Sequence, residues 1–283
     1  MPLLNRRTPW AALGLTVCIL TAVSARDVLA QSADLTNRAA IEGTSPAGAA
    51  KAVEGRHEAF NRLLAPFVQD GRVDYEGFQA HESDLDRYLL TLARTDPASL
   101  TEGEQLALWI NAYNAFTIKL ILSRYPELSS IRDIPRRWQV RRWSVGGERY
   151  SLDDIEHEIL RVDFDEPRIH FAIVCASFSC PDLAAEAYTA DRIDTQLDEA
   201  ARRFLANREK GFRVEALPGE GHSRAEIRVS RIFKWFRKDF ERQGSLVEFL
   251  LPLVPAPERA LLRPHVEDVR VRFLDYDWSL NDS

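Results

Sequence analysis

Apolar residues recur at helical spacing along much of the chain. The strongest pattern covers residues 102–125, where large apolar side chains leave little room for a solvated face. We therefore predict a buried helix that Pro126 terminates. Two asparagines of this stretch, Asn111 and Asn114, are three residues apart and so share one face of the helix. Further helices are predicted from the same periodicity in residues 57–68, 83–93, 191–207 and 230–241 and in the segment that starts after Ser151.

Shorter alternating segments predict a small amount of β-structure. Two segments with central turn residues are typical of β-hairpins, and a third alternating segment predicts a last strand; these are residues 140–150, 212–229 and 269–273. Residues 168–175 form a β-branched apolar run that predicts an interior strand, followed by a helix with Cys180 in its first turn. The pattern predicts an α+β fold: a single helix-rich domain with a small mixed or antiparallel sheet and two β-hairpins.

The N-terminus has the anatomy of a secretory signal peptide. Basic residues precede an apolar stretch, and small residues at Ala25 and Ala30 offer two cleavage points, of which we favour the second. The apolar stretch is shorter than the ~20 residues of a membrane span, so no stable span is expected after cleavage. We therefore predict a signal peptide over residues 1–30, a flexible linker over 31–52 and a domain over 53–283, in a periplasmic or secreted protein.

Charge and cysteine content narrow the classes of partner. The chain has 37 Lys and Arg against 43 Asp and Glu, interleaved and with a formal net charge of −6, so nucleic acid is not expected as a partner. An unknown small molecule or peptide is expected instead, and no cofactor is predicted. Cys18 lies inside the signal peptide, which leaves Cys175 and Cys180 in a compartment that permits disulfides.

Reactive side chains are densest where the predicted strand meets the predicted helix. His170, Cys175, Ser179 and Cys180 fall within eleven residues. In one interpretation Cys180 (or Cys175) is a nucleophile, because a cysteine at a helix start has a stabilised thiolate, and His170 is its base. Strand alternation places His170 and Cys175 on opposite faces, so His170 would more readily meet Cys180.

Two other interpretations of the same cluster stay open. Cys175 and Cys180 can form a disulfide around four intervening residues, a local structural bridge whose spacing differs from the C-x-x-C of thioredoxin-type sites. Alternatively, His170 and the two cysteines can supply three ligands to a zinc ion, although their spacing matches no zinc motif. A metal site is therefore not the interpretation that we prefer.

Other polar residues lie where the pattern predicts a core. Asn111 and Asn114 need partners there, and we expect them to satisfy the backbone of a neighbouring loop or to orient a catalytic group. Glu156 borders the apolar stripe of the helix after Ser151 and can supply a carboxylate to a site. Its neighbour His157 is not expected in the same pocket, because adjacent helical residues diverge by about 100°. Several aromatic residues can stack sugars or bases but are more often core: Trp235, Phe236, Phe240, Tyr276 and Trp278.

Several segments together resemble the family named domain of unknown function 547. They are LWINAYNA from Leu108, SLDDIEHEILR from Ser151, HFA from His170, CASFSCP from Cys175, SRIFKWF from Ser230 with Asp239, and YDWSLN from Tyr276. The resemblance covers about residue 53 to the end. It implies one α+β domain, exported in bacteria, without an established reaction. The residues it shares with the arguments above are Asn111, Asn114, Glu156, His157, His170, Cys175, Ser179 and Cys180.

Two functions are compatible with these features. The first is a thiol-dependent hydrolase or acyl/amide transferase with the candidate site residues Cys180, His170, Cys175, Glu156, Asn111 and Asn114. The second is a non-catalytic periplasmic binding or scaffold module with a structural Cys175–Cys180 disulfide.

Overall fold

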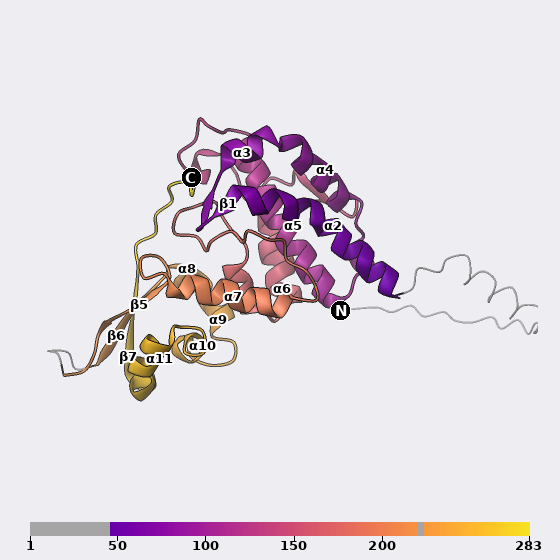
Figure 1. Ribbon diagram of the computed structural model, residues 1–283. Helices are drawn as coiled ribbons and strands as arrows, with labels where there is room; N and C mark the ends of the chain where they lie inside the picture. Colours follow the sequence, from indigo (N-terminus) through magenta and orange to yellow (C-terminus); the bar gives the residue numbers. More distant parts are fainter. Residues whose placement is uncertain (1–45, 220–223) are drawn as a thin grey trace, which may run out of the picture. The chain divides into compact units, whose positions relative to one another are not determined.

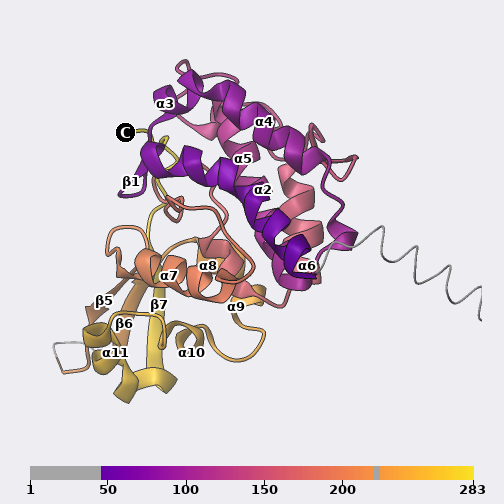
Figure 2. The same cartoon turned by 45° about the vertical axis from the view of Figure 1, so that its right-hand side comes forward.

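Helix α5 (Glu102–Leu122) is the centre of a large hydrophobic core in the computed structural model, which describes residues 46–219 and 224–283. Apolar side chains surround the helix on all sides, so other elements must cover its whole circumference. Figures 1 and 2 show helices α2 (Pro46–Phe67) and α4 (Glu82–Ala93) alongside it. The predicted buried helix is confirmed, and it ends ahead of Pro126.

Short elements complete the cover of α5. They join or flank the longer helices and contribute apolar side chains, among them Tyr75 and Phe78, to the same core. Their bounds are β1 (Val68–Gln69), β2 (Arg72–Val73), α3 (Tyr75–Ala80), β3 (Trp143–Val145), β4 (Glu148–Tyr150), the π-helical segment η3 (Asp154–Leu160) and α6 (Arg161–Asp163).

A mixed three-stranded sheet organises a second hydrophobic core. Strand β6 (Ala225–Val229) pairs antiparallel with β5 (Phe212–Ala216) and parallel with β7 (Val269–Phe273). Helix α7 (Ile193–Ala206) packs against this sheet through residues such as Phe204. The remaining helices of this core are α8 (Ile232–Trp235), α9 (Arg237–Phe240), α10 (Leu246–Leu250) and α11 (Ala256–Leu262).

The described residues have an α+β fold, as the sequence predicts. Both hairpins are present, β3–β4 around Gly146-Gly147 and β5–β6, and the last strand is β7. Gly146 and Gly147 have φ angles of 61° and 86°, a left-handed conformation that glycine adopts without steric cost. The helix predicted over 230–241 is interrupted at Phe236, which separates α8 from α9.

The interior strand predicted over residues 168–175 is wrong. This segment begins as the 3-10 helix η4 (Pro167–Phe171) and continues as a loop. Pro167 occupies the first turn, where its missing N–H costs nothing, and the carboxylate of Glu166 accepts the backbone N–H of Arg168 at 3.0 Å. The apolar run is buried as expected, but a capped helical turn buries it instead of a strand.

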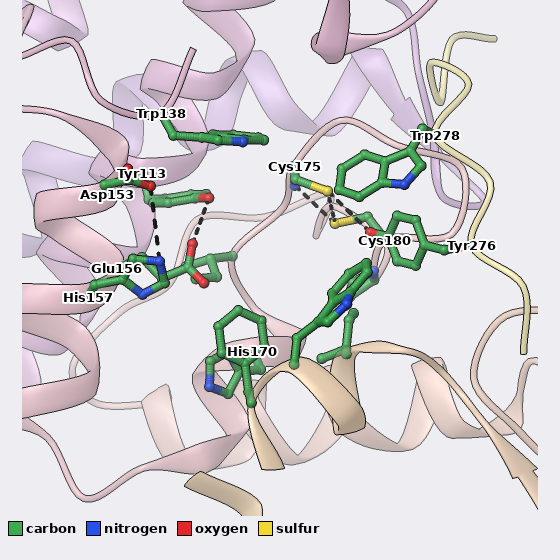
Figure 3. A pocket seen from close by; sticks show the side chains of 15 residues that line it. Tyr113, Trp138, Asp153, Glu156, His157, His170, Cys175, Cys180, Tyr276 and Trp278 are labelled. Atoms are coloured by element: carbon green, nitrogen blue, oxygen red, sulfur yellow. Dashed lines mark hydrogen bonds and ion pairs between the residues drawn. The ribbon is translucent and has the colours of Figure 1, made fainter. Parts of the chain in front are cut away.

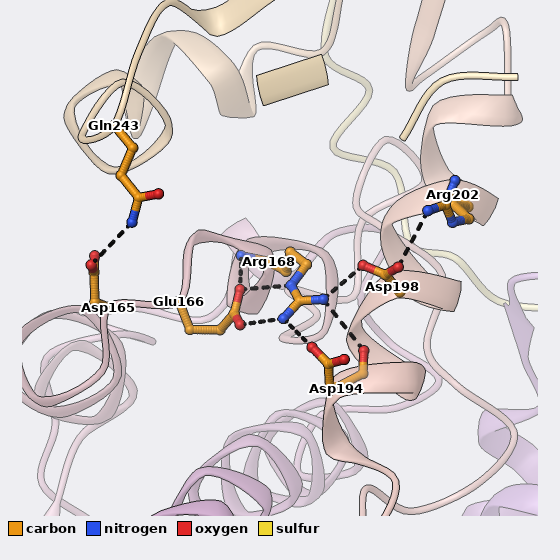
Figure 4. A network of polar contacts seen from close by, with 7 residues as sticks. All are labelled: Asp165, Glu166, Arg168, Asp194, Asp198, Arg202 and Gln243. Carbon is orange, nitrogen blue, oxygen red and sulfur yellow. Dashed lines mark hydrogen bonds and ion pairs between the residues drawn. The ribbon is translucent and has the colours of Figure 1, made fainter. Parts of the chain in front are cut away.

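Arg168 fixes η4 to the start of α7. Its guanidinium donates to Glu166 Oε2 and Asp194 Oδ1, each at 2.6 Å, and to Asp198 Oδ1 at 2.7 Å (Figure 4). The hydrogen bond to Glu166, together with those to Asp194 and Asp198, raises the pKa of this guanidinium further above its usual value and outweighs the opposing effect of burial. These ion pairs therefore fix the position of η4, and with it the start of the loop that carries Cys175.

The helix predicted to begin at Cys180 is also wrong. The next helix along the chain is α7, which begins at Ile193. The backbone near Cys180 instead bonds to the C-terminal segment: Phe178 N–H donates to Ser279 O at 2.8 Å and Ser179 N–H to Asp277 O at 3.2 Å. These bonds hold the segment as a loop against the C-terminal segment, and because no helix starts at Cys180, no helix dipole acts on its thiol.

Several expectations fall on the N-terminal region. The predicted signal peptide and most of the predicted linker lie outside the described residues, while α2 begins at Pro46, inside the stretch 31–52. Within residues 46–219 and 224–283, no helix has both the length and the apolar character that crossing a membrane requires.

Candidate functional site

A cavity of about 180 Å³ brings together side chains from five parts of the chain. Tyr113 comes from α5, Glu156 from η3, Cys175 from the loop after η4, Trp235 from α8 and Tyr276 from the C-terminal segment (Figure 3). Few of these residues are close in sequence, so the cavity exists only in the folded chain. The other residues that line it are Trp138, Asp153, His157, His170, Ile173, Cys180, Pro181, Ile232, Phe236 and Trp278.

The two cysteines lie side by side at one wall of this cavity. Both are free thiols, and their sulfur atoms are 2.9 Å apart. The Cys175 side chain is partly exposed to the cavity, whereas Cys180 is 4% exposed. Ala176, with a φ of 58°, adopts a left-handed conformation that helps reverse the chain between them.

The surroundings of the two sulfurs shift the pKa values of the two thiols in opposite directions. Cys180, the Ser177 hydroxyl and the Tyr276 hydroxyl all contact Cys175 Sγ, the last two at 3.3 Å. The contact with Cys180, followed by those with Ser177 and Tyr276, lowers the pKa of the Cys175 thiol to about 6 despite its burial. Burial and the neighbouring Cys175 raise the pKa of the Cys180 thiol. Cys175 is therefore the thiolate and Cys180 its hydrogen-bond donor.

Asn114 holds the loop that carries Cys175. Its side-chain amide donates to Ala172 O and its carbonyl accepts from Val174 N, each at 2.9 Å. Asn111 forms the same pair of bonds to the backbone of Tyr188, at 2.8 and 2.9 Å. Both asparagines thus bind loop backbone, the first of the two roles expected for them, and neither lines the cavity.

Glu156 is an acid that ionises close to neutral pH. Tyr113 donates its hydroxyl to Glu156 Oε2 at 3.0 Å, and the carboxyl group faces the cavity (Figure 3). Burial raises the pKa of Glu156 to about 7, and it outweighs the opposing effects of His157 and of the Tyr113 hydrogen bond. A carboxyl group with such a pKa can both donate and accept a proton at neutral pH.

The expectation that Glu156 and His157 face different environments is wrong. Both line the cavity, and His157 Nε2 lies 4.0 Å from Asp153 Oδ1. The reason is local: η3 is a π-helix, whose wider turn brings neighbouring side chains to a smaller angular separation than an α-helix does.

His170 lies on a different wall of the cavity from the cysteines (Figure 3). Its Nε2 is 2.8 Å from Asp239 Oδ2, and its ring stacks on Phe236 with centroids 4.0 Å apart. Burial lowers the pKa of His170 more than Asp239 raises it, so the ring is neutral at pH 7. No hydrogen bond joins it to either sulfur among the described residues, and the strand geometry that paired it with Cys180 is absent.

Asp239 anchors His170 to η3 and α6. Arg161 Nε donates to Asp239 Oδ2 at 2.6 Å, and Arg161 Nη1 is 3.0 Å from His157 Nδ1. Burial raises the pKa of Asp239, but the bonds from His170 and Arg161 outweigh it and hold that pKa well below its usual range. The carboxylate is charged, and the histidine beside it is held in place instead of being free to turn toward the cysteines.

Aromatic rings form the wall next to the cysteine pair. The rings of Trp235, Tyr276 and Trp278 pack together with centroids 4.6 to 5.8 Å apart. Trp235 is 45% exposed and the other two are partly buried, so this cluster is a surface of the cavity more than a core. The prediction that these rings belong to the core is correct only in part.

Three residues of the site are not among the predicted site residues, although Tyr276 was named as a ring that can stack sugars or bases. Tyr113 and Tyr276 look like ordinary core aromatics in a linear pattern, and only the fold places their hydroxyls beside Glu156 and Cys175. Asp239 lies in a helix-forming segment whose periodicity gives it no special place, and it was named only as part of the family resemblance.

The zinc interpretation finds no support in the described part of the chain. No group of three or more His, Cys, Asp or Glu side chains there is arranged to hold a metal ion. His170 bonds to Asp239, and the cysteines bond to each other, so the three proposed ligands do not converge.

Comparison with known proteins identifies a family. Residues 97–205 match the model of the family described as "Protein of unknown function, DUF547". Over these residues the chain is similar to this family. The match includes Tyr113, Glu156, His170 and both cysteines, whereas the aromatic wall of Trp235, Tyr276 and Trp278 lies outside it. No curated protein and no solved structure matches the chain.

Proposed function

We propose that this protein is a thiol-dependent enzyme that hydrolyses or transfers an acyl or amide group, with Cys175 as the nucleophile. The observation that carries the proposal is the contact set of Cys175 Sγ: a thiol and two hydroxyls lie against a sulfur whose pKa is lowered to about 6, at the wall of a cavity. A thiolate at neutral pH that faces a cavity is suited to attack a carbonyl carbon.

Glu156 is the proton carrier of this proposal. The Cys175 thiolate attacks the carbonyl carbon and forms a thioester, and the departing amine or alcohol takes the proton of Glu156. The resulting carboxylate then accepts a proton from water or from another acceptor nucleophile, which attacks the thioester and releases the thiolate. The pKa of about 7 allows Glu156 to serve in both directions at neutral pH.

His170 and Cys180 have supporting roles in this scheme. His170 is buried and bonded to Asp239, which suits a residue that holds one wall of the cavity. Cys180 donates a hydrogen bond to the nucleophile and so stabilises its thiolate. The aromatic wall offers apolar surface for a flat or cyclic part of the substrate.

Acylation by p-nitrophenyl acetate tests the proposal without knowledge of the natural substrate. We expect a burst of p-nitrophenolate and one acetyl group on Cys175, seen by intact mass and peptide mapping. Glu156→Gln should keep the burst and slow the later steady release. Cys180→Ser is the matched control and should still be acylated at position 175. An acetyl group that persists in Cys175→Ser, or that is absent from the wild-type protein, overturns the proposal.

The rival is a non-catalytic binding or scaffold module in which Cys175 and Cys180 form a permanent structural disulfide. The exposed ring of Trp235 supports a binding role. Alkylation after mild reduction separates the two: a permanent bridge resists mild reductant and leaves both cysteines unmodified, whereas the Cys175 thiol of the enzyme reacts at once.

We propose further that the protein works in the periplasm or outside the cell. The basic start, apolar stretch and small residues near Ala30 support export. N-terminal sequencing of the protein from a periplasmic fraction should begin just after Ala25 or Ala30, and an intact N-terminus in the cytoplasmic fraction would contradict it.

A further inference from the structure

The position of Cys180 beside Cys175 suits a reaction in which both sulfurs take part. An acyl transfer uses only Cys175, yet Cys180 Sγ lies 2.9 Å from Cys175 Sγ and is held there by the backbone. The N–H of Cys175 donates to Cys180 Sγ at 3.0 Å. A sulfur that accepts a backbone N–H is stabilised as a thiolate once its own proton has left.

Accessibility differs between the two sulfurs in the way that stepwise exchange requires. Cys175 faces the cavity and a solute can reach it, whereas Cys180 is 4% exposed and lies behind it. An external disulfide therefore meets Cys175 first, and Cys180 reaches only what is already attached to Cys175. The two cysteines are the only ones outside the predicted signal peptide, so no other thiol of the mature chain competes.

We propose that Cys175 and Cys180 form a reversible dithiol–disulfide pair that exchanges electrons with an external disulfide. The Cys175 thiolate attacks one sulfur of that disulfide, the external S–S bond breaks, and one external thiolate leaves. The proton of Cys180 passes to this thiolate. The Cys180 thiolate then attacks Cys175 Sγ, which closes the Cys175–Cys180 bond and releases the second external thiolate. The external disulfide gains two electrons, the pair loses two, and an external dithiol reverses the reaction.

This exchange is independent of the acyl chemistry, and oxidation of the pair would remove the nucleophile of the proposed enzyme. The spacing of the pair, with four residues between the cysteines, differs from a C-x-x-C site. What brings the sulfurs together here is the fold: Asn114 fixes the chain before Cys175, and the C-terminal segment binds the backbone of Phe178 and Ser179.

Oxidised glutathione is the probe for the test. The reduced wild-type protein should lose two hydrogen atoms by intact mass, without a glutathione adduct, and dithiothreitol should restore it. Cys180→Ser should stop at one glutathione on Cys175, because no second sulfur resolves the adduct. Cys175→Ser should react more than tenfold more slowly than the wild type. Circular dichroism establishes that each variant is folded.

The measurement on the wild-type protein is sufficient to refute the exchange. A stable glutathione adduct on the wild-type protein, or no reaction at all, would refute the exchange, and so would a bridge that dithiothreitol cannot open. The acetylation experiment on reduced protein is separate: acetylation of Cys175 without bridge formation leaves the proposed function intact, and bridge formation without acetylation leaves only the exchange.

Discussion

Replacing Glu156 by glutamine should remove a pH-dependent destabilisation of the folded protein. The folded state raises the pKa of this carboxyl group from 4.5 to about 7, so between these values it binds a proton that the unfolded state has already lost. Because the folded state binds more protons, stability falls as the pH rises through this window. Glutamine has no proton to lose and keeps an oxygen that can accept from Tyr113.

The size of the effect follows from the pKa. One pKa unit corresponds to 1.36 kcal/mol, so the raised pKa of Glu156 costs about 3 kcal/mol above pH 7, and less to the extent that water enters the open cavity. We therefore compare the free energies of unfolding of Glu156→Gln and of the wild type at each pH. The variant's value minus the wild-type value should rise by about 2 to 3 kcal/mol between pH 4.5 and pH 8. Cys175 titrates in the same range but is present in both proteins, so the subtraction removes its contribution.

Urea denaturation at several pH values measures this difference. Glu158→Gln is the matched control, because Glu158 lies on the same π-helical segment with an exposed side chain. Its difference from the wild type should stay constant across the pH range. If the Glu156→Gln difference also stays within about 0.5 kcal/mol from pH 4.5 to 8, the carboxyl group is not held protonated by burial, and its role as proton carrier fails with it.

Three further substitutions test the surroundings of the site. Arg161→Ala removes a charged partner from the buried carboxylate of Asp239 and should lower the free energy of unfolding by about 3 kcal/mol in urea; an unchanged midpoint would contradict this. Asn114→Ala removes two buried hydrogen bonds and should lower the free energy of unfolding by about 2 to 4 kcal/mol. It should also speed alkylation of the shielded Cys180 thiol, whereas equal stability would show that the loop does not depend on these bonds. Tyr276→Phe removes a hydroxyl from Cys175 and should raise the pKa of that thiol above 6, which the absorbance of the thiolate measures; no change in the pKa would exclude this hydrogen bond.

The sequence predicted the secondary structure best where a single local pattern dominates. The all-round apolar character of residues 102–125 gave a buried helix, and Gly146-Gly147 gave a hairpin. It failed over residues 168–175, because a short β-branched run is compatible with either a strand or a buried turn. The capping carboxylate of Glu166 and the ion pairs of Arg168 with α7 decided between them, and the second of these depends on tertiary structure.

The sequence predicted which residues form the candidate site better than it predicted how they are arranged. Cys175, Cys180, Glu156 and His170 do line one cavity. Which cysteine is the thiolate could not be predicted, because it depends on the contact between the two sulfurs and then on the Ser177 and Tyr276 hydroxyls, the last of which lies about a hundred positions away in sequence. A helix start at Cys180 was expected from capping residues alone, but the segment is a loop bonded to the C-terminal segment, a contact that the local pattern does not show.

The pH dependence of Cys175 alkylation tests the central claim most directly. Reduced protein is treated with iodoacetamide at a series of pH values, and the rate at each cysteine is followed by peptide mapping. We predict that Cys175 reacts first, with a midpoint near pH 6, and that Cys180 stays unmodified over the same time. A midpoint near the ordinary thiol value of 9.0, or faster reaction at Cys180, would contradict the assignment of Cys175 as the nucleophile.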